Sequence, residues 1–315
     1  MHVEYVFLLR SLVNLGLGDW EALSFQRNGF QVCIPKPIAD TSLYLKIQPS
    51  GGPVVFDISR FKPGSGLALQ ATMVSIQLKS ALEVPEDKID QTFQPIALEV
   101  FHHFKSWIRV LTRQHWIGYQ QTAFPQQDFN VNVITGELKK PLGTRSVSVG
   151  FDYWKPLDQI VWSALGEKLA KGRLPSAGQL FFCEGLVDMG TGDLAQAVVE
   201  LGAACELEVY STIADSLQGR KAAPENLKKV ERLNLARKVK LLGSLNGHSF
   251  KRFDANAARL VNKLYGMRGA AIHRADLPFV DNSKSPMWNA SQLIRFVHAV
   301  ERLLGWLDIQ RSALV

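Results

Sequence analysis

Cysteine is scarce in this 315-residue chain, and its three cysteines form no recognisable pattern. Their number is odd and no two of them make a Cys-x-x-Cys spacing, which argues against a disulfide scaffold and a structural zinc site and fits a reducing compartment. No stretch approaches the roughly 18 uncharged apolar residues of a membrane span, so we expect no contact with a membrane. The first residues lack the basic region of a signal peptide. We therefore expect a cytoplasmic protein.

The sequence also lacks the motifs of several common enzyme classes. It has no glycine-rich phosphate loop ending in Lys-Ser or Lys-Thr, no Gly-x-Ser-x-Gly elbow and no His-Glu-x-x-His helix. The adjacent His102 and His103 would point about 100° apart on a helix, which suits a metal pair poorly, and we interpret both as surface residues. We predict no metal site and no cofactor.

What the chain does have is an uneven excess of positive charge. Its formal net charge is +7. The basic stretch, residues 220–252, holds ten lysines and arginines against only Glu225 and Glu231, which gives it a local charge of +8. Such an excess is typical of a surface that binds a polyanion, although a solvated lysine-rich face has the same composition.

Alternation of apolar and polar residues with a period of two indicates a β-rich first half. The alternating segments are 43–47, 54–58, 74–78, 129–133 and 147–151. Apolar residues at spacings of three and four over 96–111 predict one amphipathic helix embedded among these strands. We place this β-rich domain at residues 1–152.

From about Pro156 the apolar spacing becomes helical. Asp193 and Asp254 precede two of the predicted helices and are expected to cap them, and the last helix is expected to begin near Ala290. Four or five antiparallel helices suffice for a closed bundle, which we place at residues 153–315. The expected fold class is α+β: a β-rich domain with one embedded helix, followed by an all-α antiparallel bundle.

Two charged residues in the predicted bundle form an Arg-x4-His element. Arg268 and His273 are separated by small or apolar residues, and on a regular helix their side chains would point about 140° apart. The two side chains would therefore lie on either side of a groove rather than along one narrow face of the helix. In a purely structural interpretation, Arg268 pairs with Glu206 or Glu208, because a carboxylate among apolar residues needs a partner, and His273 is an ordinary helix-end histidine.

This element, set late in a helical domain just after Leu264 and Tyr265, resembles the signature of the HEPN domain. The segment 192–200, which leads into 203–206, is similar to an earlier helix of the same bacterial proteins. Those proteins often carry a β-rich N-terminal region with one embedded helix, as expected here. The resemblance covers residues 156–310.

The resemblance implies a metal-independent endoribonuclease that acts as a homodimer, often in toxin or anti-phage defence systems with a neutralising or defence partner protein. Arg268 and His273 would be its catalytic residues. The residues expected to support them are Glu206, Arg274 as a phosphate contact and Asp276 as the group that orients the histidine. The residues expected to bind RNA are Lys228, Lys229, Arg232, Arg237, Lys238 and Lys240.

Two alternatives remain open. Members of this family commonly have a polar residue, often asparagine, directly after the arginine, where this chain has Gly269. In the first alternative, the chain is a non-catalytic HEPN-like module that binds RNA or nucleotides and dimerises. In the second, the helical face is an interface of a structural partner protein with no affinity for nucleic acid.

Overall fold

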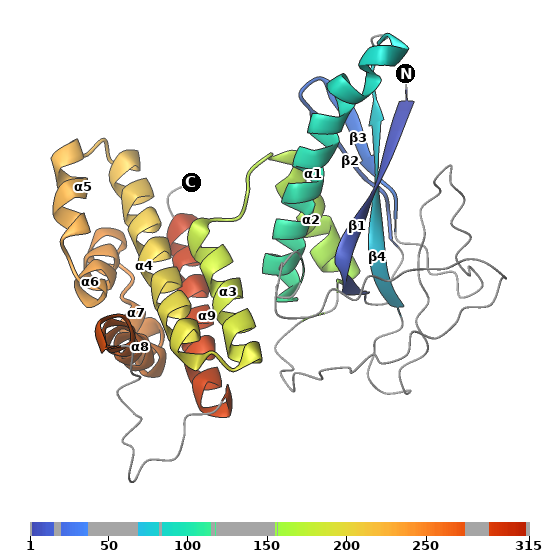
Figure 1. Cartoon of the computed structure of the whole chain (residues 1–315). Helices are drawn as coiled ribbons and strands as arrows, with labels where there is room; N and C mark the ends of the chain where they lie inside the picture. The colour runs from blue at the N-terminus through green and yellow to red at the C-terminus, as the bar shows by residue number, and fades with distance from the viewer. Residues whose placement is uncertain are drawn as a thin grey trace. The chain divides into compact units, whose positions relative to one another are not determined.

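The computed structural model describes residues 2–15, 20–36, 69–81, 84–114, 117, 155, 157–274 and 290–312. The chain divides into two compact units, Met1–Pro175 and Ser176–Val315. The first contains a small antiparallel sheet and two long helices, and the described part of the second is helical (Figure 1). The protein is therefore of the α+β class, as the sequence predicts.

The first unit is built on a four-stranded antiparallel sheet in the order β1-β4-β3-β2. The strands are β1 (His2–Leu15), β2 (Leu23–Arg27), β3 (Phe30–Ile34) and β4 (Leu69–Lys79). Asn28 and Gly29 join β2 to β3 with φ angles of 50° and 83°, the left-handed conformation of a two-residue hairpin turn. The predicted strand at 74–78 is confirmed within β4, and the other four predicted segments lie outside the described residues.

Two helices pack against this sheet. They are α1 (Ile89–Thr112), which follows the short 3-10 helix η1 (Glu86–Lys88), and α2 (Gln159–Ala170). α1 confirms the predicted embedded helix, and its Phe93 ring lies 5.0 Å from that of Phe30 on β3. Trp162 of α2 packs edge-on against Trp20 at 5.6 Å and against Phe104 of α1 at 6.2 Å. Aromatic side chains thus join the two helices to the sheet, within a core that also contains buried aliphatic residues of the strands.

α2 belongs to the first unit, although the sequence predicts that it is part of the bundle at residues 153–315. The Trp162 indole donates a hydrogen bond to the carbonyl of Glu21 at 2.7 Å, and Arg27 of β2 donates to the carbonyl of Leu169 at 2.6 Å. The observed division therefore falls after Pro175, not between residues 152 and 153. Helical periodicity shows which face is buried but not which neighbour covers it.

The two adjacent histidines of α1 differ in burial. His102 is exposed, as predicted, whereas His103 keeps only 8% of its surface exposed. Interpreting His103 as a surface residue was wrong because it lies on the side of α1 that packs into the unit. Burial lowers the pKa of His103, and the nearby carboxylate of Glu99 opposes this effect.

The second unit is a bundle of helices. They are α3 (Ala177–Thr191), α4 (Leu194–Gly219), α5 (Pro224–Glu231), α6 (Leu235–Asn246), α7 (Phe250–Phe253), α8 (Ala255–Arg274) and α9 (Ala290–Ser312). Both predicted caps are confirmed: Asp193 accepts a hydrogen bond from the Gln196 amide at 3.0 Å, and Asp254 accepts one from the Ala257 amide at 2.9 Å. Such caps satisfy amides that have no partner within the helix.

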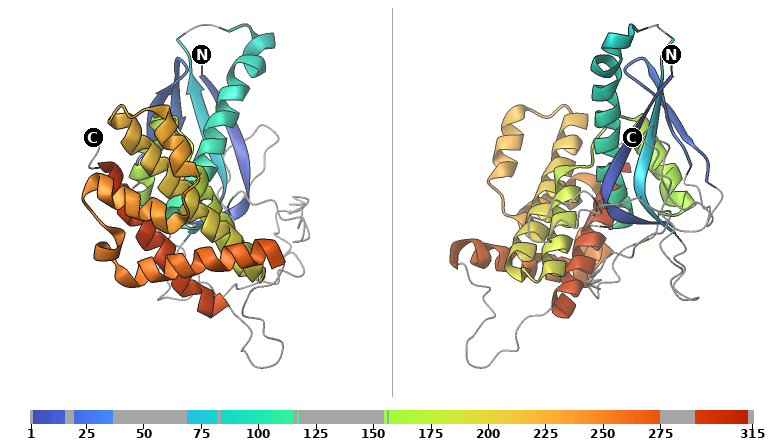
Figure 2. Two further views of the ribbon diagram at one scale, coloured as in Figure 1. Left: turned by 90° about the vertical axis from the view of Figure 1, so that its left-hand side faces the viewer. Right: turned by 45° about the vertical axis from the view of Figure 1, so that its right-hand side comes forward.

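The long helices of the second unit do not all run in one direction. In Figure 1, α3, α4 and α9 lie side by side, whereas α8 is seen nearly end-on, and Figure 2 shows α8 crossing the others. The predicted antiparallel arrangement describes the α3–α4 pair, which turns at Gly192 with a φ of 89°, but it does not describe α8. None of the helices in the described part of the chain is long and apolar enough to cross a membrane.

The three cysteines have different exposures, which can be checked chemically. Cys183 and Cys205 are buried and Cys33 is half-buried; burial raises the pKa of the Cys205 thiol to about 12 and keeps it protonated. We expect a thiol reagent at mildly alkaline pH to modify Cys33 alone in the folded protein and all three cysteines after unfolding in urea. Mass spectrometry counts the adducts, and rapid modification of a second thiol in the folded protein would contradict this placement.

Candidate functional site

Three of the predicted site residues meet in the second unit. The carboxylate of Glu206 on α4 accepts a hydrogen bond from Arg268 Nη1 at 2.8 Å through Oε2 and one from Lys238 Nζ at 3.1 Å through Oε1. Arg268 lies on α8 and Lys238 on α6. We call these three residues the Glu206 cluster. It links three helices, and its two cations and one anion leave one net positive charge.

The side chain of Arg268 reaches Glu206 through a notch at Gly202 of α4. A Cβ on Gly202 would lie 2.5 Å from Cδ of Arg268 and 3.1 Å from its Cβ, so glycine is what lets the arginine stem pass close to the backbone. The Arg268 guanidinium carbon lies 5.8 Å from the centre of the Tyr265 ring, within range of a cation–π contact. The stem is thereby fixed, while 24% of the side chain stays exposed.

Lys238 differs from the other predicted RNA-binding residues because it is buried, with 4% of its surface exposed. Its ammonium lies 5.7 Å from the centre of the Tyr210 ring, and the Tyr210 hydroxyl donates a hydrogen bond to Glu231 of α5 at 3.0 Å. That hydrogen bond raises the pKa of Tyr210. Lys238 points into the bundle, so it does not belong to the surface that a polyanion would meet.

The five other residues predicted to bind RNA are exposed. They are Lys228, Lys229, Arg232, Arg237 and Lys240. They come from the last turn of α5, from its C-cap and from the first half of α6. The basic stretch therefore presents its charge to solvent at these positions, while its one buried lysine bonds to Glu206.

The Arg-x4-His element lies on one continuous helix. α8 runs through both Arg268 and His273, and Gly269 has no positive φ angle that would relax the backbone between them. No described atom lies within 4 Å of a Cβ built on Gly269. The side chains of His273 and Arg274, and the whole of Asp276, lie outside the described residues.

A second carboxylate of α4 interacts with Arg268. Burial raises the pKa of Glu200; a hydrogen bond from Gln196 and the charge of Arg268 oppose this effect, and Glu184 adds to it. Glu200 Oε2 is buried without a hydrogen-bond partner among the described residues. Arg268 therefore bonds to Glu206 but only interacts electrostatically with Glu200.

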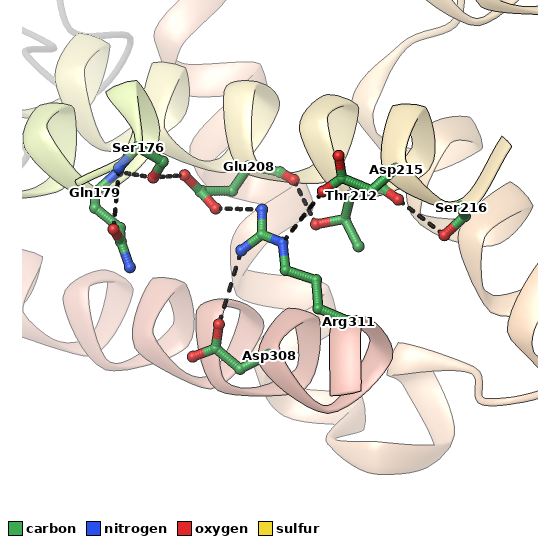
Figure 3. A network of polar contacts seen from close by, with 8 residues as sticks. All are labelled: Ser176, Gln179, Glu208, Thr212, Asp215, Ser216, Asp308 and Arg311. Carbon is green, nitrogen blue, oxygen red and sulfur yellow. Dashed lines mark hydrogen bonds and ion pairs between the residues drawn. The ribbon is translucent and has the colours of Figure 1, made fainter. Parts of the chain in front are cut away.

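A separate ion-pair network lies around Glu208, also on α4 (Figure 3). Glu208 is 1% exposed, and its carboxylate accepts hydrogen bonds from Arg311 Nη2 of α9 at 2.8 Å and from the Ser176 hydroxyl. A Cβ on Gly178 of α3 would lie 2.5 Å from Cγ of Glu208. This network holds α3, α4 and α9 together at close approach, and we interpret it as structural.

The sequence left two possible partners for Arg268, Glu206 and Glu208, and the structure distinguishes them. Glu206 pairs with Arg268, and Glu208 pairs with Arg311. Neither Arg311 nor Gly202 is predicted from the sequence as a site residue. Gly202 carries no signal in a single sequence, and Arg311 is 103 residues away from its partner along the chain.

Comparisons of the chain with protein-family models, curated proteins and solved structures find no match. The HEPN resemblance therefore depends on the residues of the chain itself. Within the described ranges, no three His, Cys, Asp or Glu side chains gather as a metal ion would need. The candidate site is the Glu206 cluster together with the last turn of α8.

Proposed function

We propose that residues 176–315 form a HEPN-type domain that acts as a homodimer and cuts RNA without a metal ion. The Glu206 cluster supports this proposal, because Arg268, its expected supporting acid and a lysine of the basic stretch come together from three helices. The arginine fork matches a carboxylate and a phosphate with the same geometry. An arginine that is part-exposed and held by a carboxylate is therefore suited to receive a phosphate.

The proposed reaction transfers the RNA phosphate from its bond with the 5′-oxygen to the neighbouring 2′-oxygen. One His273 removes the proton of the 2′-hydroxyl, the 2′-oxygen attacks phosphorus, and the bond to the 5′-oxygen breaks as the second His273 protonates that oxygen. The products are a 2′,3′-cyclic phosphate and a 5′-hydroxyl. Across a two-fold axis, both Arg268 guanidiniums stabilise the negative charge that develops on the phosphoryl oxygens.

The exposed part of the basic stretch supports RNA as the substrate. The five exposed residues of this stretch that are predicted to bind RNA flank the position on α6 from which Lys238 reaches the Glu206 cluster. Contacts of this kind with phosphates hold a nucleic-acid strand with little regard to sequence. The family resemblance extends the proposal to a toxin or anti-phage role controlled by a neutralising or defence partner protein.

A second candidate function is a non-catalytic domain that binds RNA or nucleotides and dimerises. It is favoured by the hydrogen bond of 2.8 Å to Glu206, which already occupies a donor of Arg268. It is also favoured by Gly269, which supplies no side chain to orient a histidine on the following turn. Both candidates use the same basic surface to bind RNA, but only the first candidate cuts it.

Incubating the purified full chain with single-stranded RNA in EDTA tests the proposal. We expect cleavage products that end in a 2′,3′-cyclic phosphate, identified by mass spectrometry. Salt-sensitive binding without cleavage would favour the non-catalytic domain. Cleavage that needs a divalent metal contradicts the proposed chemistry, and absence of any RNA affinity contradicts both candidates.

A further inference from the structure

Lys238 is the least exposed member of the Glu206 cluster and cannot serve as a surface contact. Its side chain is 5% exposed, compared with 26% for Glu206 and 24% for Arg268. Its ammonium lies 3.1 Å from Glu206 Oε1, while Arg268 uses the other oxygen. Each cation therefore bonds to one oxygen of a shared carboxylate, and Glu206 connects Lys238 to Arg268.

Because Lys238 and Arg268 share the carboxylate of Glu206, Lys238 affects how strongly Glu206 neutralises Arg268. With both cations present, the cluster keeps one net positive charge next to a part-exposed guanidinium. Without the ammonium, the whole charge of Glu206 is left to Arg268 and the cluster becomes neutral. A unit charge acts over several ångströms at a part-buried site because water screens it less there than in bulk solvent.

The stem of Arg268 cannot adjust to such a change. Cδ of the arginine already lies in the Gly202 notch, and Nε is buried without a hydrogen-bond partner among the described residues. The guanidinium end must therefore respond by rotating toward Glu206 or by binding it more tightly. Either response removes donors from an incoming phosphate.

We infer that Lys238 is a positioning residue that acts through Glu206: it holds one carboxylate oxygen and so leaves Arg268 oriented and charged enough to bind an RNA phosphate. The inference rests on the proposed function for the identity of the anion. It gives Lys238 a role different from that of the exposed Lys240 of the same helix, which would contact RNA directly.

The test compares Lys238→Met and Lys238→Arg with Lys240→Met, a matched change at an exposed lysine two residues along α6. Affinity for a fluorescein-labelled single-stranded RNA oligonucleotide is measured over a range of salt concentrations. We expect Lys238→Met to weaken binding by about tenfold, because Arg268 then turns its donors to Glu206 and loses its phosphate contact. Lys240→Met should lower the slope of affinity against salt by about one through the loss of its own phosphate contact, and Lys238→Arg should restore most of the affinity lost in Lys238→Met.

A second readout does not depend on RNA. The Nε–H group of Arg268 gives an NMR signal that an Arg268→Lys variant identifies by its loss. We expect Lys238→Met to shift or broaden this signal, Lys238→Arg to return it toward its original position and Lys240→Met to leave it in place. Thermal unfolding confirms that each variant is folded.

The two readouts separate this inference from the proposed function. An unmoved Arg268 signal in folded Lys238→Met overturns the inference whether or not RNA binds. Unchanged RNA affinity in folded Lys238→Met also overturns it when the wild-type chain binds RNA, because Arg268 would then bind the phosphate without Lys238. If the wild-type chain binds no RNA while the Arg268 signal responds as expected, the proposed function fails and the coupling of Lys238 to Arg268 stands.

Discussion

Replacing His273 by alanine is expected to slow metal-independent RNA cleavage by at least about 10²–10⁴-fold, the usual contribution of a general acid or base. In a homodimer the substitution removes both histidines from the shared site, so the larger loss is expected. Binding of RNA should change little, because the exposed lysines and arginines of α5 and α6 remain. The rate is measured with a single-stranded RNA in EDTA under single-turnover conditions.

His248→Ala is the matched control for this prediction. His248 is exposed between α6 and α7 and lies outside the Arg-x4-His element, so its removal should leave the rate unchanged. A His273→Ala protein that is folded and cuts RNA as fast as wild type would show that another group transfers the proton. An equal loss in both variants would point to a general effect of histidine on RNA binding rather than to catalysis.

Replacing Arg311 by methionine is expected to lower the free energy of unfolding by about 3 kcal/mol, near the lower end of what a broken buried ion pair costs. The reason is the carboxylate of Glu208, which is 1% exposed and would lose the cation that bonds to it at 2.8 Å. The arginine itself is 28% exposed, and that exposure is why we expect no larger effect. Urea unfolding followed by circular dichroism measures the change.

Arg302→Met is the control, because it removes an arginine of the same helix from a solvent-exposed pair with Asp254. Such pairs contribute about 0–1 kcal/mol. Adding Glu208→Gln to Arg311→Met should recover part of the loss, since the buried negative charge is then gone. If Arg311→Met and Arg302→Met destabilise the protein equally, the network around Glu208 does not stabilise the bundle as argued.

Local rules predicted the helices of the second unit well. Asp193 and Asp254 were recognised as caps because an acceptor side chain before an apolar repeat satisfies free amides, and both bonds are present. The hairpin at Asn28-Gly29 is not among the predicted elements, although that dipeptide is a strong signal for a two-residue turn. Periodicity does not predict β1, because its residues do not alternate strictly between apolar and polar types.

The candidate site was predicted only in part. The pairing of Arg268 with an acid of α4 followed from the apolar residues around Glu206, since a carboxylate there needs a partner. The burial of Lys238 was not foreseen, because a lysine within a basic run is usually solvated. Its position depends on how α6 packs against α4, and a residue pattern along one helix does not specify that packing.

The hydroxyl of Ser176 makes two hydrogen bonds, and both limit where a shortened protein containing only the helical unit can begin. It caps α3 by accepting a hydrogen bond from the Gln179 amide at 3.1 Å, and it also donates one to Glu208. A shortened protein that begins after Ser176 loses both bonds, whereas one that begins at residue 153 retains α2 and exposes Trp162 without its aromatic neighbours. A new N-terminus is therefore best placed after the end of α2 at Ala170 and no later than Ser176.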